Sequence, residues 1–335
     1  MYKQIKKIEK VSLNNKGSKL YLYLKEEKKL VEIDSFGNIK KEITFFDMKQ
    51  VYRFNITDEN FIASFDNEKT IFYSNEGVEL LTFEKQLYFS FLEENDIYIY
   101  IKNKDFLYQF DKKGYKVEIF PFSEKKIFSH LYNAFLIFKK ENILYTHLDK
   151  KSEIPLLWQK DLSDITSYKD YDGSLKQGDI REIYSYNNTL IVLTQVFILR
   201  LHIETGEIIY SLRLPAGLMT LSIEENKAYG CYGYHYMEID LEKGELINFV
   251  RIENALLNGK EYNAIMNKAC YKDGFVFHGL RLEGGQYAVG AINTKTGNRE
   301  WISLLSFNMV EKIEFHDDKM FISDTGGNLF IYQRE

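Results

Sequence analysis

Residues 291–301 read AINTKTGNREW and contain an apolar strand, a polar turn that ends in Gly297, and the start of a second strand. Glycine adopts a positive φ angle without steric cost, and a tight hairpin between right-twisted strands requires such an angle. Looser copies of this unit recur along the whole chain. The fold is therefore expected to be a repeat of such hairpins.

Eight pairs of short apolar strands align with this unit, and their first strands begin at residues 20, 61, 97, 134, 190, 228, 275 and 320. Most of the turns after the second strands end in glycine, at positions 37, 77, 114, 206, 244 and 297, with Ser152 in the fourth set. A period of about 40 residues built from short strands is typical of a β-propeller with one four-stranded blade per repeat. We predict an all-β chain, a single β-propeller domain over residues 1–335 with eight blades. Seven blades is the alternative if the fifth or the last set is irregular.

The last set ends after its third strand, which would leave an unpaired sheet edge. Residues 2–6 precede the first innermost strand, which is predicted at residues 8–13. They can pair with residues 329–333 as the outer strand of the last blade. The ring is therefore predicted to be closed by the N-terminal strand.

The composition favours a folded β-protein, with 45% hydrophobic and 16% aromatic residues. The net charge of -5 comes from interspersed charges of both signs, which is mildly unfavourable for binding nucleic acid. No run of 18 apolar residues and no secretory signal is seen, so we expect a cytoplasmic protein without a membrane partner. A monomer is expected, and the many Lys, Ile and Asn residues suggest an AT-rich bacterial genome.

Three copies of the repeat, residues 200–210 (RLHIETGEIIY), 237–249 (MEIDLEKGELINF) and 291–301, resemble the repeat of the quinoprotein-like (PQQ-like) and WD40-like β-propellers. The resemblance implies that the aromatic residue after the glycine turn packs between blades, a role for Trp301 and for its counterpart Trp158. Quinoprotein dehydrogenases also carry adjacent cysteines and a calcium site. Cys231 and Cys270 are far apart and no matching acidic motif is present, so the resemblance implies the fold and no quinone cofactor.

No local motif of a hydrolase, metalloprotease, redox enzyme or nucleotide-binding protein is present. The six histidines are scattered over different repeats without metal-ligand spacing. Residues 170–174 (DYDGS) are similar to a calcium loop but lack its third ligand and terminal Glu, which favours a polar surface loop. The two cysteines are expected to be buried free thiols. No catalytic, cofactor or metal residue is therefore assigned.

The longest interval between repeats, Gln159–Arg181, is polar and mixed in charge, and a second long connection covers Arg251–Tyr262. Insertions in repeat proteins lie on one face, which is often the binding face. A linker without function is an equal alternative for the first interval. The residues predicted to contact a partner are Tyr168, Asp170, Tyr171, Asp172, Arg181, Arg251, Glu261 and Tyr262.

These observations favour a non-enzymatic cytoplasmic propeller that binds a protein partner. A narrower hypothesis is a bacterial immunity or inhibitor protein that neutralises a basic toxin through its own acidic charge. The alternative is a lyase or glycan-active hydrolase with carboxylates in the central channel, for which Glu182 and Glu314 are candidates. A scaffold for envelope assembly is disfavoured because no export signal is seen.

Overall fold

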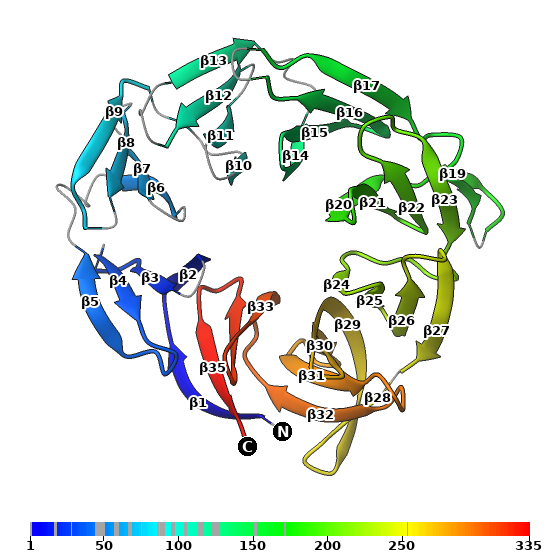
Figure 1. The fold of residues 1–335 in the computed structure, drawn as a ribbon. Coiled ribbons are helices and arrows are strands. Elements are labelled where there is room, and N and C mark those ends of the chain that lie inside the picture. Colours follow the sequence, from blue (N-terminus) through cyan, green and yellow to red (C-terminus); the bar gives the residue numbers. More distant parts are fainter. Residues whose placement is uncertain are drawn as a thin grey trace.

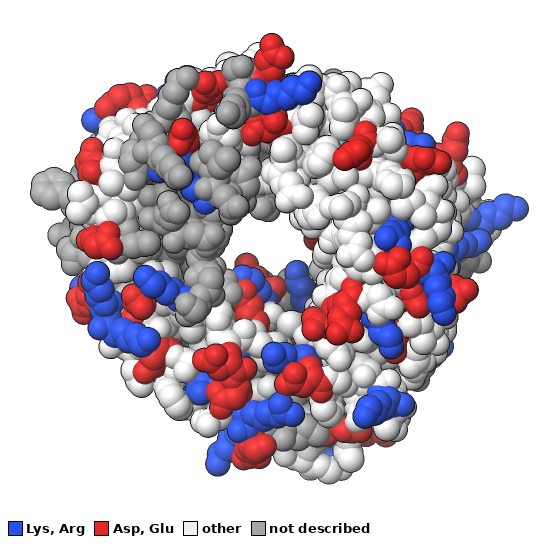
Figure 2. Space-filling view, in the orientation of Figure 1, with Lys and Arg blue, Asp and Glu red and all other residues white. Residues whose placement is uncertain are grey.

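In the computed structural model the chain forms a ring of small antiparallel sheets around a central channel, as Figures 1 and 2 show. The structure describes residues 2–335 except 17–18, 28, 44–50, 57–59, 66–68, 75, 86, 88–90, 95–97, 104–105, 113–116, 122–126, 151–152, 171 and 253. Regular structure in the described residues is entirely β. None of them forms a helix long and apolar enough to cross a membrane.

Each blade is a four-stranded sheet in which the chain runs from the innermost to the outermost strand. The strands of blades 1 to 4, in that order, are β2 (Val11–Lys16), β3 (Lys19–Leu24), β4 (Lys29–Ile33) and β5 (Ile39–Ile43); β6 (Val51–Ile56), β7 (Asn60–Phe65), β8 (Thr70–Ser74) and β9 (Glu79–Phe83); β10 (Phe91–Glu94), β11 (Tyr98–Asn103), β12 (Phe106–Asp111) and β13 (Val117–Pro121); and β14 (Ile127–Tyr132), β15 (Phe135–Lys140), β16 (Ile143–Leu148) and β17 (Leu156–Asp161).

Two hairpins and the chain termini modify this pattern in the second half of the ring. The hairpin β18 (Ser167–Lys169) and β19 (Leu175–Gln177) precedes blade 5, and β28 (Asn254–Leu257) joins the sheet of blade 7. The strands of blades 5 to 8 are β20 (Ile180–Tyr186), β21 (Thr189–Thr194), β22 (Phe197–His202) and β23 (Ile208–Arg213); β24 (Ser222–Glu224), β25 (Lys227–Tyr232), β26 (His235–Asp240) and β27 (Glu245–Arg251); β29 (Lys260–Lys272), β30 (Phe275–Leu282), β31 (Tyr287–Asn293) and β32 (Arg299–Leu304); and β33 (Val310–His316), β34 (Lys319–Asp324), β35 (Leu329–Arg334) and β1 (Tyr2–Ile8).

The core lies between the blades, because each sheet is covered on both faces by its neighbours. In β21 of blade 5, Leu190 and Val192 pack towards blade 4, whereas Ile191 and Leu193 pack towards blade 6. All four side chains are fully buried. Burying one such side chain stabilises a fold by roughly 1.5–3 kcal/mol, so a blade gains most of its stability from the ring.

One contact recurs at the glycine turn between the third and fourth strands. A side chain from the outer strand of one blade covers the glycine of the next blade: Trp158 covers Gly206, and Tyr210 covers Gly244. The Trp158 indole Nε1 donates a hydrogen bond to the Ile203 carbonyl at 2.7 Å. The packing between blades that the repeat implied for Trp158 is therefore confirmed. Trp301 also packs between blades, on Tyr332 of blade 8, with ring centroids 5.7 Å apart.

Blade 8 takes its outer strand from the other end of the chain, as predicted. Strand β1 pairs with β35 from Tyr2 opposite Arg334 to Ile8 opposite Leu329, and both termini lie together in Figure 1. The Lys6 ammonium donates a hydrogen bond to the Gly37 carbonyl of blade 1 at 2.6 Å, so β1 also makes the contact at the next glycine turn.

The structure has eight blades, so the alternative of seven is excluded. The first innermost strand was predicted at residues 8–13, but β2 begins at Val11. The reason is that Ile8 still belongs to β1, where it pairs with Leu329.

Candidate functional site

The antiparallel order of the strands divides each blade into two edges. One edge holds the start of the first strand, the end of the second, the start of the third and the end of the fourth, together with the connections to the next blade. We call this the crossover edge. The opposite edge, the glycine-turn edge, holds the turns between strands one and two and between strands three and four. Both long connections predicted from the sequence lie on the crossover edge.

The first connection is shorter and more ordered than the predicted loop. Residues at both ends of Gln159–Arg181 belong to blade strands, β17 and β20, and the middle forms the hairpin β18–β19. Tyr168 on this hairpin is 7% exposed, so its side chain supports the hairpin. The dipeptide Asp172-Gly173 lies at the hairpin tip, with Gly173 at φ 81°, so the polar loop predicted there is the turn of a hairpin.

Two acids predicted to face a partner hold this hairpin. The Asp170 carboxylate forms an ion pair with Lys176. The Asp172 Oδ1 atom accepts a hydrogen bond from the Ser174 backbone N–H at 2.9 Å. Tyr171 lies outside the described residues.

The second connection also contains a hairpin, formed by β28 and the first residues of β29. Figure 1 shows its tip beyond the outer strand β32. Asn258 and Gly259 at this tip both have positive φ angles, 52° and 75°, as a two-residue hairpin turn requires. The Glu261 carboxylate accepts a hydrogen bond from the Asn254 amide at 2.9 Å, and the Lys260 ammonium lies 4.9 Å from the centre of the Tyr262 ring. The described residues predicted on the two connections therefore share one edge of the ring but lie on separate hairpins, except Arg181 and Arg251, which belong to the blade strands β20 and β27.

The crossover edge also carries exposed apolar side chains that the sequence did not single out. Four large apolar residues exposed in the described part of the chain lie at the glycine-turn edge, Phe36, Ile39, Val78 and Leu156, and others lie along the outer strands. Those on the crossover edge are Phe106, Leu175, Met219, Tyr232, Leu256, Ile265, Leu304, Phe307 and Met309. Most of them belong to blades 5 to 8. Hydrophobic pattern alone could not identify them, because an apolar residue in a short connection has no period that reveals its exposure.

Arg181 connects the two sides of this region. Its Nη1 atom donates a hydrogen bond to the Leu218 carbonyl at 2.8 Å, and its guanidinium lies 5.8 Å from the centre of the Tyr232 ring. Arg181 therefore joins blade 5 to blade 6 and contacts Met219 and Tyr232. Arg251, the last residue of β27, is exposed on the same edge.

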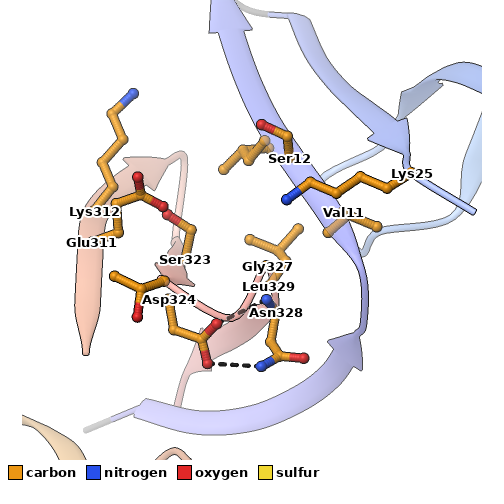
Figure 3. Close-up of a pocket in the computed structure, with 12 residues that line it drawn as sticks. Val11, Ser12, Lys25, Glu311, Lys312, Ser323, Asp324, Gly327, Asn328 and Leu329 are labelled. Carbon is orange, nitrogen blue, oxygen red and sulfur yellow. Dashed lines mark hydrogen bonds between the residues drawn. The ribbon is translucent and has the colours of Figure 1, made fainter. Parts of the chain in front are cut away.

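A polar pocket of about 450 Å³ lies at the seam between blades 8 and 1 (Figure 3). The Asp324 carboxylate at its base accepts hydrogen bonds from the Gly326 and Asn328 backbone N–H groups, both at 2.9 Å, and from the Asn328 side chain at 2.8 Å. Burial raises the pKa of Asp324, but the hydrogen bonds from Asn328 and Ser306 outweigh it and hold the pKa below its usual value. This carboxylate therefore organises a turn and is not free to act as a base.

The two carboxylates considered for an enzymatic site lie on different blades. Glu182 is on β20 of blade 5 and Glu314 is on β33 of blade 8. Glu314 also forms an ion pair with Lys312.

The thiols and metal-ligand side chains in the described part of the chain form no reactive group. Burial raises the pKa of Cys231 to about 12 and that of Cys270 to about 11, so neither is a thiolate at neutral pH. Both cysteines are free. Among the described residues no three His, Cys, Asp or Glu side chains gather in a way that could hold a metal ion.

Neither a protein-family model nor a curated protein matches this sequence. Solved structures do match in fold. BamB from Moraxella catarrhalis has a TM-score of 0.64 at 8% identity, covering 100% of both chains. The C-terminal WD40 domain of Sif2 has a TM-score of 0.64 at 9% identity, covering 100% of this chain and 99% of that one. Sqt1 of Saccharomyces cerevisiae has a TM-score of 0.65 at 9% identity, covering 100% and 98%.

The chain thus has the β-propeller fold of the PQQ-like and WD40-like proteins, as its repeat predicted. Identities this low establish the fold alone.

Proposed function

We propose that this protein binds a protein partner through the crossover edge of blades 5 to 8. The observation that carries the proposal is the gathering of exposed apolar side chains on that edge, where Phe307 is 72% exposed and Leu256 is 68% exposed. Contiguous exposed apolar side chains on a folded protein mark interaction sites. Interfaces are enriched in aromatic residues, Met and Arg, and this edge offers Tyr232, Met219 and Arg181.

The test is partner capture with matched variants. The tagged protein, its Tyr232→Ser, Phe307→Ser double variant and a Val78→Ser control would each be used to capture proteins from the native cell. Val78 is 61% exposed but lies at the glycine-turn edge. We expect the partner to bind the wild type and the control and to be lost with the double variant. A partner retained equally by all three would contradict the proposal.

The hairpin β18–β19 provides a second, local test of the same proposal. Replacing residues 167–177 with a short turn leaves β17 and β20 intact, unlike removal of the whole interval Gln159–Arg181. We expect weaker capture of the partner with unchanged melting temperature. Unchanged capture would remove this hairpin from the binding site.

A cytoplasmic immunity role is the narrower form of the proposal, with a toxin as the partner. It rests on the net charge of -5 and on the absence of a local catalytic motif from the sequence. The check is co-expression with toxin-like products of adjacent reading frames. Rescue of growth by the wild type, and not by the Tyr232→Ser, Phe307→Ser variant, would support it, whereas no rescue from any neighbouring product would contradict it.

A further inference from the structure

A row of four side chains runs from blade 6 across the sheet of blade 7 at the crossover edge. Gly233 and Met266 form an antiparallel bridge, which places Tyr234 of blade 6 beside Ile265. Ile265 is opposite Arg281 in the pairing of β29 with β30, and Arg281 is opposite Tyr287 in the pairing of β30 with β31. The row therefore reads Tyr234, Ile265, Arg281, Tyr287 across neighbouring strands.

This row borders an open pocket of about 390 Å³. Tyr234, Ile265 and Arg281 line it, and the turn with Gly284 and Gly285 closes one side. A Cβ atom added at either glycine would meet nothing within 4 Å, so the backbone of this turn is open to a ligand. The opposite face of the same strands is closed, since Ala264 and Met266 are fully buried between blades 6 and 7.

The Arg281 guanidinium is available for a ligand. It is exposed, and within the described residues no ion pair or hydrogen bond occupies it. Glu283 lines the same pocket but forms no ion pair with Arg281. A guanidinium beside a tyrosine and an aliphatic side chain combines a bidentate carboxylate receptor with an apolar surface.

Two more arginines extend the positive charge along this edge. Arg213 and Arg251 end the outer strands of blades 5 and 6, and both are exposed. The exposed acids Glu261, Glu283 and Glu311 also lie on this edge, so the edge carries charges of both signs.

We propose that the pocket bordered by Tyr234, Ile265 and Arg281 binds an acidic side chain of the protein partner, next to an apolar side chain that packs on Ile265. This inference rests on the proposed function and specifies the chemistry of the docking segment. The carboxylate binds the Arg281 guanidinium, and the Tyr234 side chain borders the apolar contact.

The test uses short fluorescent peptides with a Glu-Leu-Glu, a Gln-Leu-Gln or a Lys-Leu-Lys centre, with binding followed by fluorescence anisotropy. We expect the Glu peptide alone to bind, with an affinity that falls as salt is added. Arg281→Gln should weaken binding by about tenfold, as expected for a central interface residue. Ile265→Ser should weaken binding of the Glu peptide without changing its salt dependence.

Arg334→Gln is the matched control, because Arg334 is an exposed arginine paired with Asp273 outside the crossover edge. The Arg334→Gln variant should bind the Glu peptide with the same affinity as the wild type. Equal binding of the Glu and Gln peptides, no binding of the Glu peptide to the wild type, or no effect of Arg281→Gln would each overturn the inference. Loss of partner capture in Tyr232→Ser, Phe307→Ser together with a failed peptide test would refute this inference and leave the proposed function standing.

Discussion

Gly206 and Gly297 occupy the same place in blades 5 and 7, with φ angles of 69° and 71°, but different side chains face them. A Cβ atom at Gly297 would lie 3.2 Å from Val250, whereas one at Gly206 would lie 2.7 Å from the Trp158 ring. A strained φ angle costs on the order of 1 kcal/mol or more. We expect Gly297→Val to lower the free energy of unfolding by about that amount, and Gly206→Val to lower it further because the Trp158 ring must move.

Denaturant unfolding of the two variants measures this difference. A Gly297→Val variant of wild-type stability would show that the turn does not need its positive φ angle. The need for glycine could be predicted from the sequence, because a tight turn follows the strand pattern. The resemblance to the propeller repeat also implied that Trp158 packs between blades, but not that it covers Gly206, since the two residues belong to different blades.

The Glu242 carboxylate of blade 6 forms hydrogen bonds and an ion pair with side chains of blade 5. The carboxylate accepts hydrogen bonds from the Tyr186 hydroxyl at 2.7 Å and from Arg200 Nη1 at 2.9 Å. The hydrogen bonds from Tyr186, Arg200 and Asn187 lower the pKa of Glu242 to about 2. Because this pKa lies below the ordinary value of about 4.3, the ionised form stabilises the fold above that value, and the stabilisation is lost as pH falls towards 2.

We therefore expect Glu242→Gln to reduce stability at neutral pH and to flatten the loss of stability between pH 4.3 and 2. Urea unfolding at a series of pH values measures both effects. Glu245→Gln serves as the control, because Glu245 is exposed on the neighbouring strand. If the free energy of unfolding fell with pH identically in Glu242→Gln and the wild type, the stabilising role of the ionised Glu242 carboxylate would be contradicted.

At the scale of elements, β1 determines whether the ring is closed. Removing residues 2–8 leaves the β35 edge unpaired and removes the Lys6 contact with Gly37. We expect the truncated protein to melt at a lower temperature and to self-associate through the free edge, as measured by calorimetry and size-exclusion chromatography.

A synthetic peptide of residues 2–8 added to the truncated protein provides the control. It should restore the monomer and raise the melting temperature, because it can pair with β35 in the native register. A scrambled peptide should do neither. Wild-type stability of the truncated protein without any peptide would show that closure by β1 is dispensable.

The elements themselves were largely predictable from the sequence, and the candidate site was not. The middle strands of the blades are short, nearly continuous apolar runs that are buried on both faces, and the positions of β21 and β22 follow from that pattern. The connections were predicted as polar loops, although Asn258-Gly259 is a hairpin signal in the sequence. The row of Tyr234, Ile265 and Arg281 depends on the bridge between two blades, which no local pattern encodes.

At the scale of the whole molecule, each blade is buried mainly by its neighbours, so the ring is expected to unfold as one unit. The two tryptophans report on separate parts of it. Trp158 lies in blade 4 and covers the turn of blade 5, and Trp301 lies in blade 7 and packs against Tyr332 of blade 8. Each indole environment is lost only when a contact between blades is lost.

We expect the variants Trp158→Phe and Trp301→Phe, each with one remaining tryptophan, to show one transition in urea. In each variant, the urea midpoint from tryptophan fluorescence should coincide with the midpoint from far-UV circular dichroism. Because both midpoints come from the same protein, destabilisation by the substitution itself does not affect the comparison. A repeat array held only by nearest-neighbour contacts could unfold in stages, but closure by β1 gives every blade two neighbours. Separate midpoints for blades 4 and 7 would mean that the ring contains two folding units, and that closure does not couple them.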